Sequence, residues 1–104
     1  MHRTLRLLVV PALLLGSAGL SWAQDAKLAR NLAATCANCH GTNGHARGDM
    51  KPLASMSSGK MLALLADYKS GAQPSTVMGQ LVKGYTDAQL QLIAGFFAAQ
   101  PAGK

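Results

Sequence analysis

Apolar residues recur at the spacing of an α-helix along most of the chain after Gln24, and no stretch alternates as a strand would. The first helical segment, Asp25–Cys36, is rich in Ala and Leu, contains no Gly or Pro, and has Leu28 and Leu32 on one face. Asp at its start can cap the helix. This pattern predicts a short helix that runs directly into the two cysteines of the chain.

Further helices are predicted nearer the C-terminus. One begins at Ser57 or Ser58, and its apolar face is formed by Met61, Leu62, Leu64, Leu65 and Tyr68. A weaker helical piece covers 75–83. The last helix begins at a capping box, in which Thr86 is followed three residues later by Gln89, and its apolar positions are Leu90, Ile93, Phe96 and Phe97.

These patterns predict an all-α protein of three to four short helices. The segment 41–52, with three Gly, one Asn, one Asp and one Pro, is expected to be a loop. Helices this short are marginally stable in isolation. Something central must therefore stabilise them against one another.

The N-terminal residues have the pattern of an export signal. Two arginines precede the apolar run 7–15, and Ser21-Trp22-Ala23 has small residues at the two positions that a signal peptidase recognises. The run is shorter than the roughly 20 apolar residues that span a bilayer. We expect a cleavable secretory signal peptide at 1–23 and a single periplasmic domain at 24–104, without a stable membrane span. An uncleaved N-terminal anchor is the alternative.

Charge and composition restrict the class of partner. The chain has 10 Lys and Arg against four acidic residues, with a net charge of +6, but the basic residues are dispersed. No basic run with interleaved aromatics occurs, so nucleic acid is not an expected partner. A diffuse positive surface can steer an acidic protein partner. Because a domain this small has a thin core and few aromatic residues, it needs a staple or a bound group.

Both cysteines lie in the stretch Cys36-Ala37-Asn38-Cys39-His40. A disulfide between them would close so short a loop that it would stabilise little. A thioredoxin-like CxxC follows a strand in a βαβ setting, and no strand is predicted here. Zinc could use Cys36, Cys39, His40 and His45, but adjacent Cys39 and His40 side chains rarely point at one metal, and zinc sites more often pair two short-spaced ligand couples.

Cys-x-x-Cys-His is also the signature of covalent attachment of a c-type haem. Two thiols add across the two vinyl groups of the porphyrin, and two intervening residues provide the reach. The next residue then lies under the iron as its proximal ligand. We therefore interpret Cys36 and Cys39 as thioether anchors of one haem c, and His40 as an iron ligand. The export signal would deliver the chain to the compartment where this attachment occurs.

With this motif the chain resembles class I c-type cytochromes over nearly all of 24–104. The resemblance implies a C-terminal helix that crosses the N-terminal one. Leu28 and Leu32 should then meet Ile93, Phe96 or Phe97, with Gly95 allowing close approach of the two backbones. The resemblance also implies that the backbone carbonyl beside Pro52 accepts the free N–H of His40 and so fixes its tautomer.

The resemblance further implies a methionine sulfur as the second axial ligand, and its position in the family matches Met78. Met50 and Met56 follow His40 in a loop long enough to reach around a haem, so they stay open as alternatives. Met61 lies on the apolar face of a predicted helix, where methionine more often fills the core. The apolar cover of the haem is expected to come from Leu53, Leu65, Val77, Leu81, Ile93 and Phe96.

The segments 75–85, 68–71 and 94–97 are similar to the cytochrome subunit of flavocytochrome c sulfide dehydrogenase. Those subunits commonly contain two haem domains, whereas this sequence has one CxxCH. The resemblance implies a non-enzymatic protein that accepts single electrons from a flavoprotein subunit. Alternatives are a free-standing carrier for another redox partner and a haem protein whose labile sixth position binds small molecules. No small-molecule substrate is expected, and His45 has no assigned role beyond that of a solvated loop histidine.

Overall fold

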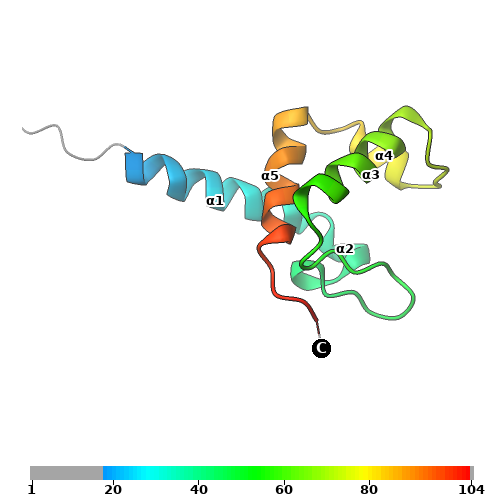
Figure 1. Cartoon of the computed structure of the whole chain (residues 1–104), viewed down its shortest axis with the longest axis horizontal. Helices are drawn as coiled ribbons and strands as arrows, with labels where there is room; N and C mark the ends of the chain where they lie inside the picture. The colour runs from blue at the N-terminus through cyan, green and yellow to red at the C-terminus, as the bar shows by residue number, and fades with distance from the viewer. Residues whose placement is uncertain (1–17, 104) are drawn as a thin grey trace, which may run out of the picture.

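The computed structural model describes residues 18–103, with side chains from residue 24 onward, and this part of the chain is helical (Figure 1). Its elements are α1 (Ala18–Ala34), α2 (Ala37–His40), the 3-10 turn η1 (Thr42–Gly44), α3 (Ser58–Ser70), α4 (Met78–Val82) and α5 (Asp87–Ala98). No strand occurs among the described residues. The prediction of an all-α protein is confirmed, and residues 18–103 form five α-helices rather than three to four.

The helix before the cysteines begins earlier and ends sooner than predicted. It starts at Ala18, on the N-terminal side of the cleavage point predicted after Ala23, and ends at Ala34. A turn at Thr35 and Cys36 then separates it from α2, which is the extra helix. The rest of the predicted signal peptide, 1–17, lies outside the described residues. None of the described helices is both long and apolar enough to cross a membrane.

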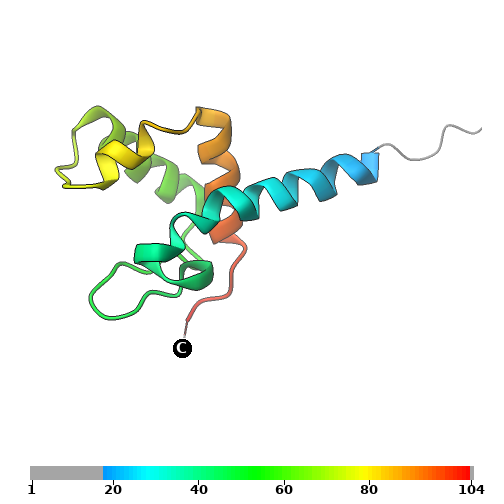
Figure 2. The ribbon, with the colours of Figure 1, turned by 180° about the vertical axis from the view of Figure 1, so that it is seen from behind.

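Helix α5 is the centre of the packing. It crosses the C-terminal half of α1 and also packs against α3, which in turn contacts α4 (Figures 1 and 2). Their buried side chains form one core, which consists of Ala33, Met61, Val82, Leu90, Ile93, Ala94 and Phe97. The crossing of the first and last helices, which the resemblance implied, is therefore present.

The residues that make this crossing differ in part from those expected. Leu32 is half-buried against the core, but Leu28 is 45% exposed, and Ala29 and Ala33 are the buried residues of α1. Gly95 is not the point of close approach, since a Cβ atom added there would meet nothing within 4 Å. The neighbouring Ala94 is fully buried and belongs to the same core as Ala33 of α1.

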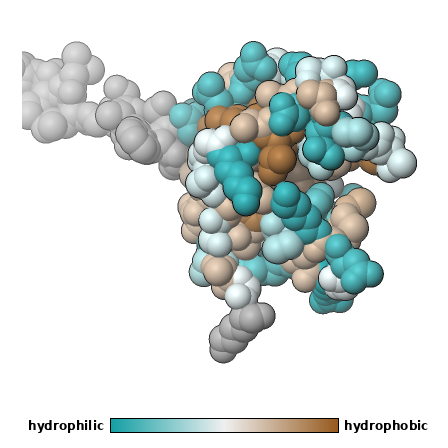
Figure 3. All heavy atoms as spheres, turned by 45° about the vertical axis from the view of Figure 1, so that its right-hand side comes forward, coloured by the Kyte–Doolittle hydropathy of each residue, from teal (hydrophilic) through white to brown (hydrophobic). Residues whose placement is uncertain are grey.

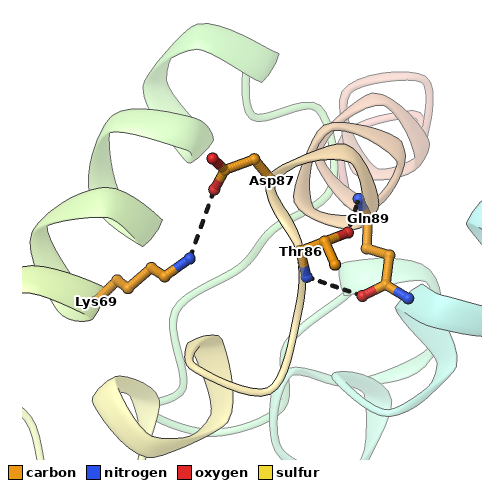
Figure 4. Close-up of polar contacts among 4 residues, drawn as sticks. All are labelled: Lys69, Thr86, Asp87 and Gln89. Carbon is orange, nitrogen blue, oxygen red and sulfur yellow. Dashed lines mark hydrogen bonds and ion pairs between the residues drawn. The ribbon is translucent and has the colours of Figure 1, made fainter.

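The helix ends follow their capping residues. Ser57 Oγ accepts a hydrogen bond from the Lys60 N–H at 3.3 Å and begins α3. At α5, Thr86 Oγ1 accepts from the Gln89 N–H at 3.1 Å, while Gln89 Oε1 accepts from the Thr86 N–H at 2.9 Å (Figure 4). The predicted capping box is therefore confirmed.

Helix α4 is shorter than the piece predicted over 75–83. Ser75 Oγ accepts from the Gly79 N–H at 2.9 Å, and residues 76 and 77 form bends, so helical structure begins only at Met78. Val82 fixes the short helix on the core, because its side chain is almost completely buried.

Candidate haem-binding site

The CxxCH stretch forms a single helical turn. The Cys39 and His40 N–H groups both donate to the Cys36 carbonyl, at 3.3 and 2.9 Å. Residues three and four apart on a helical turn lie on the same side. The turn therefore brings Cys36, Cys39 and His40 to one face. Neither cysteine is in a disulfide; Cys36 is half-buried and Cys39 is exposed.

His40 is held in one tautomer by the loop that follows it. Its Nδ1 lies 2.7 Å from the carbonyl oxygen of Lys51, the residue directly before Pro52. Because a carbonyl only accepts, Nδ1 must carry the hydrogen and donate it. In the neutral imidazole the lone pair is then on Nε2, which is the atom left to bind a metal. This is the contact that the resemblance implied for the carbonyl beside Pro52.

The two thiols differ in environment. Burial raises the pKa of the Cys36 thiol, and the nearby Cys39 raises it further, whereas a hydrogen bond involving Thr35 acts in the opposite direction. Cys36 therefore stays a neutral thiol at physiological pH. A metal ion bound by side chains alone needs at least three ligands close together. The described part of the chain has no such group of His, Cys, Asp or Glu side chains. This arrangement disfavours the zinc interpretation.

The loop after His40 is fixed by glycines at close approaches. Gly41 ends α2 with a φ of 84°, and a Cβ atom there would overlap the His45 carbonyl. Gly44 has a φ of 78°, and a Cβ atom there would lie 2.6 Å from the Ala54 nitrogen and 2.9 Å from Phe97 Cδ1. The Gly44 carbonyl accepts from the N–H groups of Leu53 and Ala54, at 2.9 and 3.1 Å. The loop is thus folded back beside the core.

Two further hydrogen bonds join this loop to the C-terminal part of the chain. The Ser55 N–H donates to the Phe97 carbonyl at 3.0 Å. His45, which had no role in the sequence interpretation, donates from Nε2 to the Pro101 carbonyl at 2.8 Å. These partners are more than 40 residues apart in sequence, and nothing in the local pattern indicates the contact. The loop that carries Lys51 is therefore fixed at both its ends.

The four methionines after the predicted signal peptide occupy different environments. Met61 is buried in the core, as its position on the apolar face predicted, and Met50 is 41% exposed. Met56 and Met78 are both half-buried at the edge of the core. Met78 is the first residue of α4. Burial thus favours Met56 and Met78 over the other two as apolar-facing sulfur ligands.

Most of the apolar residues that were expected to cover the haem are at least partly exposed. Val77 and Leu81, on either side of Met78 in sequence, are 53% and 51% exposed, and Leu53, Leu65 and Phe96 are half-buried. Figure 3 shows hydrophobic residues at the centre of one face, with hydrophilic residues around them. Of the six residues expected to cover the haem, Ile93 alone is fully in the core.

The donor set and its surroundings fit a covalently attached haem. Two free thiols and an imidazole with a free Nε2 lie on one helical turn, and Val77 and Leu81, beside Met78 in sequence, are exposed apolar side chains. The two cysteines and His40 are predicted by the spacing of the motif. No local pattern predicts the contact between Thr35 and Tyr85, whose hydroxyls lie 2.7 Å apart, or that between His45 and Pro101.

No family model matches the chain, but three curated relatives do. The cytochrome subunit of sulfide dehydrogenase from Chlorobaculum tepidum is 39% identical over 66 residues, which are 64% of this chain and 60% of the relative. Cytochrome c4 from Pseudomonas aeruginosa is 35% identical over 97 residues, 91% of this chain and 48% of the relative. Cytochrome c-552 from Acidithiobacillus ferridurans is 30% identical over 64 residues, 62% of this chain and 28% of the relative.

The chain therefore spans less than two thirds of the length of each of these relatives. The similarity to cytochrome c4 nevertheless extends over nearly the whole chain. Together with the helical fold, these relatives support the resemblance of the chain to class I c-type cytochromes, and in particular to the cytochrome subunit of sulfide dehydrogenase.

Proposed function

We propose that this chain transfers single electrons in the periplasm through one haem c, which is bound covalently by Cys36 and Cys39 and ligated by His40 and Met78. The observation that carries the proposal is the 2.7 Å contact between His40 Nδ1 and the Lys51 carbonyl. It leaves Nε2 as the ligand atom on the same helical turn as both thiols. The haem, when bound, supplies an iron that alternates between the ferrous and ferric states.

The side chains of this chain would attach and shield that group. Each thiol would add its sulfur to one carbon of a vinyl double bond and its hydrogen to the other, which needs no oxidant. The raised pKa of Cys36 supports its presence as the neutral thiol that this addition consumes. Exposed Cys39 supports an accessible edge at this side for electron exchange.

The chain's apolar residues lower the polarity around the site. Leu53, Leu65 and Phe96 pack, half-buried, against the core, and the exposed Val77 and Leu81 would be available to cover the side of Met78. A less polar surrounding favours the ferrous state, which has less charge at the iron. With His40 and Met78 both bound, no coordination position is open to a substrate, which supports electron transfer rather than catalysis.

The proposed donor is a flavoprotein that oxidises sulfide. This proposal rests on the similarity to the cytochrome subunit of sulfide dehydrogenase, of which this chain matches 60%. The flavoprotein would pass electrons one at a time to this chain, whose cysteines would not contact sulfide. A free-standing carrier for another redox protein is the competing assignment.

Co-purification and reduction test the partner. The exported protein is isolated with its associated proteins under mild conditions, and sulfide is added anaerobically while the haem spectrum is recorded. We expect a bound flavoprotein and reduction of one haem per chain. Isolation without a flavoprotein, followed by sulfide-independent reduction by another redox protein, would contradict the sulfide dehydrogenase assignment.

Carbon monoxide tests the sixth ligand. The reduced protein with stable Met ligation should bind carbon monoxide slowly and incompletely at neutral pH. Rapid, complete binding would instead support a labile site for small molecules.

A further inference from the structure

The hydroxyls of Thr35 and Tyr85 form a hydrogen bond between two side chains that are distant in sequence. The two oxygens are 2.7 Å apart, although the residues are 50 positions apart in sequence. Thr35 lies directly before Cys36. Tyr85 follows the short helix that begins at Met78. The bond thus joins the segment that contains Cys36, Cys39 and His40 to the segment that begins at Met78.

The direction of this hydrogen bond follows from the neighbouring contacts. Thr35 Oγ1 lies 3.1 Å from the Leu32 carbonyl, which can only accept, so the threonine hydrogen points there. The neighbouring Cys36 N–H does not donate to Thr35 Oγ1, because it donates to the Ala33 carbonyl at 3.0 Å. The Tyr85 O–H must then donate to Thr35 Oγ1. The tyrosine is therefore bonded through Thr35 to the end of α1.

Tyr85, the other partner in this hydrogen bond, is connected to Met78 through a short hydrogen-bonded segment of backbone. The Gly84 and Tyr85 N–H groups donate to the carbonyls of Leu81 and Val82, at 3.1 and 3.2 Å, directly after α4. Val82 is buried in the core, and the Tyr85 side chain packs against this core. Residues 78–85 thus form one hydrogen-bonded unit. Displacing Met78 outward would move this unit and strain the bond to Thr35.

We propose that Tyr85 is a positioning residue, which through its hydrogen bond to Thr35 holds the Met78 segment against the cysteine turn and slows opening of the sixth coordination position. This inference rests on the proposed function. A tyrosine hydroxyl on a half-buried ring, paired with an exposed threonine, stabilises modestly because water competes. We therefore expect its loss to accelerate opening about twofold to fivefold.

The test is the rate at which imidazole binds to the ferric protein, because Met78 must leave before imidazole can enter. Tyr85→Phe keeps the ring and removes the donor, and Thr35→Val removes the acceptor at similar volume. We expect each variant to bind imidazole about two to five times faster, and the double variant to be no faster than either. Thr35→Ser, which keeps the hydroxyl, should restore the native rate.

Two controls separate positioning from general loss of stability. Thr86→Ala removes the adjacent helix cap, destabilises the fold by a comparable amount, and should leave the imidazole rate unchanged. In a Met78→Ala background, Tyr85→Phe should have no further effect. Native rates in Tyr85→Phe and Thr35→Val, or an equal acceleration in Thr86→Ala or in the Met78→Ala background, would overturn the inference while leaving the proposed function intact. Absence of covalent haem from the wild-type protein would instead overturn the proposed function and the inference with it.

Discussion

At the scale of single residues, His40 and Gly41 show how tightly the conformation of the CxxCH turn is constrained. The imidazole is oriented by the Lys51 carbonyl, and the residue after it must be glycine because its φ is 84° and a Cβ atom would overlap the backbone of His45. The motif therefore depends on a neighbour that the usual five-residue pattern does not include.

Substitution of Gly41 or Gly44 by alanine should be costly. Each combines a left-handed φ with a backbone contact closer than a Cβ atom tolerates, so we expect about 2–4 kcal/mol of lost stability per substitution. Chemical denaturation of the haem-containing protein measures this. Gly59→Ala in α3 is the matched control, since a Cβ atom there meets nothing within 4 Å and should stabilise by about 0.5–1 kcal/mol. Equal stability of Gly41→Ala and wild type would show that the turn differs from the one described.

The assignment of Met78 as the sulfur ligand is also tested by single substitutions. Met78→Ala should abolish the weak long-wavelength charge-transfer band of Met-ligated ferric haem, whereas Met50→Ala and Met56→Ala should retain it. Met56 is the informative comparison, because it is half-buried at the edge of the same core. Persistence of the band in Met78→Ala and its loss in Met56→Ala would reassign the ligand.

Much of the site could be predicted from single residues, and the parts that could not are long-range contacts. Cys36, Cys39 and His40 form a local motif, so their spacing sufficed. The hydrogen bonds from His45 to Pro101 and from Tyr85 to Thr35 join residues 56 and 50 positions apart. The periodicity of apolar residues within a helix cannot predict contacts between residues so far apart in sequence.

At the scale of secondary-structure elements, the caps explain where helices begin. Ser57 and Thr86 both accept hydrogen bonds from N–H groups of their first turns, and both starts were predicted from the sequence. The start of α4 was not, because Ser75 bonds to Gly79 and delays the helix until Met78. The face of α1 was assigned to leucines, whereas alanines provide the close packing against α5.

The capping box of α5 should contribute more than the neighbouring ion pair. Thr86→Ala removes an N-cap and should lower stability by about 1 kcal/mol. Lys69→Ala breaks only the exposed 3.5 Å pair with Asp87 (Figure 4) and should cost less than about 0.5 kcal/mol. Thermal unfolding of the two variants compares them. A larger loss in Lys69→Ala would contradict this ranking.

Gly95→Ala tests the packing of α5 on α1. Because a Cβ atom at this exposed helical position meets no neighbour, the variant should gain about 0.5–1 kcal/mol in stability. If Gly95 instead allowed the two backbones to approach, as the resemblance suggested, the same variant would lose stability. The sign of the change, measured by denaturant unfolding, distinguishes the two arrangements.

At the scale of the whole molecule, the polypeptide has few buried side chains. Three of the eight buried hydrophobic residues are alanines, and Phe97 is the one buried aromatic among the described residues. Such a core stabilises little on its own. A haem bound at the apolar face would add a large apolar surface to it and would connect α2, the loop and α4.

Loss of attachment should therefore unfold the protein. A Cys36→Ala/Cys39→Ala variant cannot form thioethers, and we expect it to lose most of its helical circular dichroism at room temperature. Asn38→Ala is the matched control, because it changes the same helical turn outside the donor set, and it should retain haem and helicity. A double variant as helical and as stable as wild type would contradict the structural role assigned to the haem.

Covalent haem content tests the central claim most directly. The protein is isolated, denatured, and analysed by pyridine haemochrome spectroscopy and intact mass. The account predicts one haem per chain, retained through denaturation in wild type and absent from the Cys36→Ala/Cys39→Ala variant. A wild-type chain that carries no covalent haem, or one that releases it on denaturation, would contradict the account.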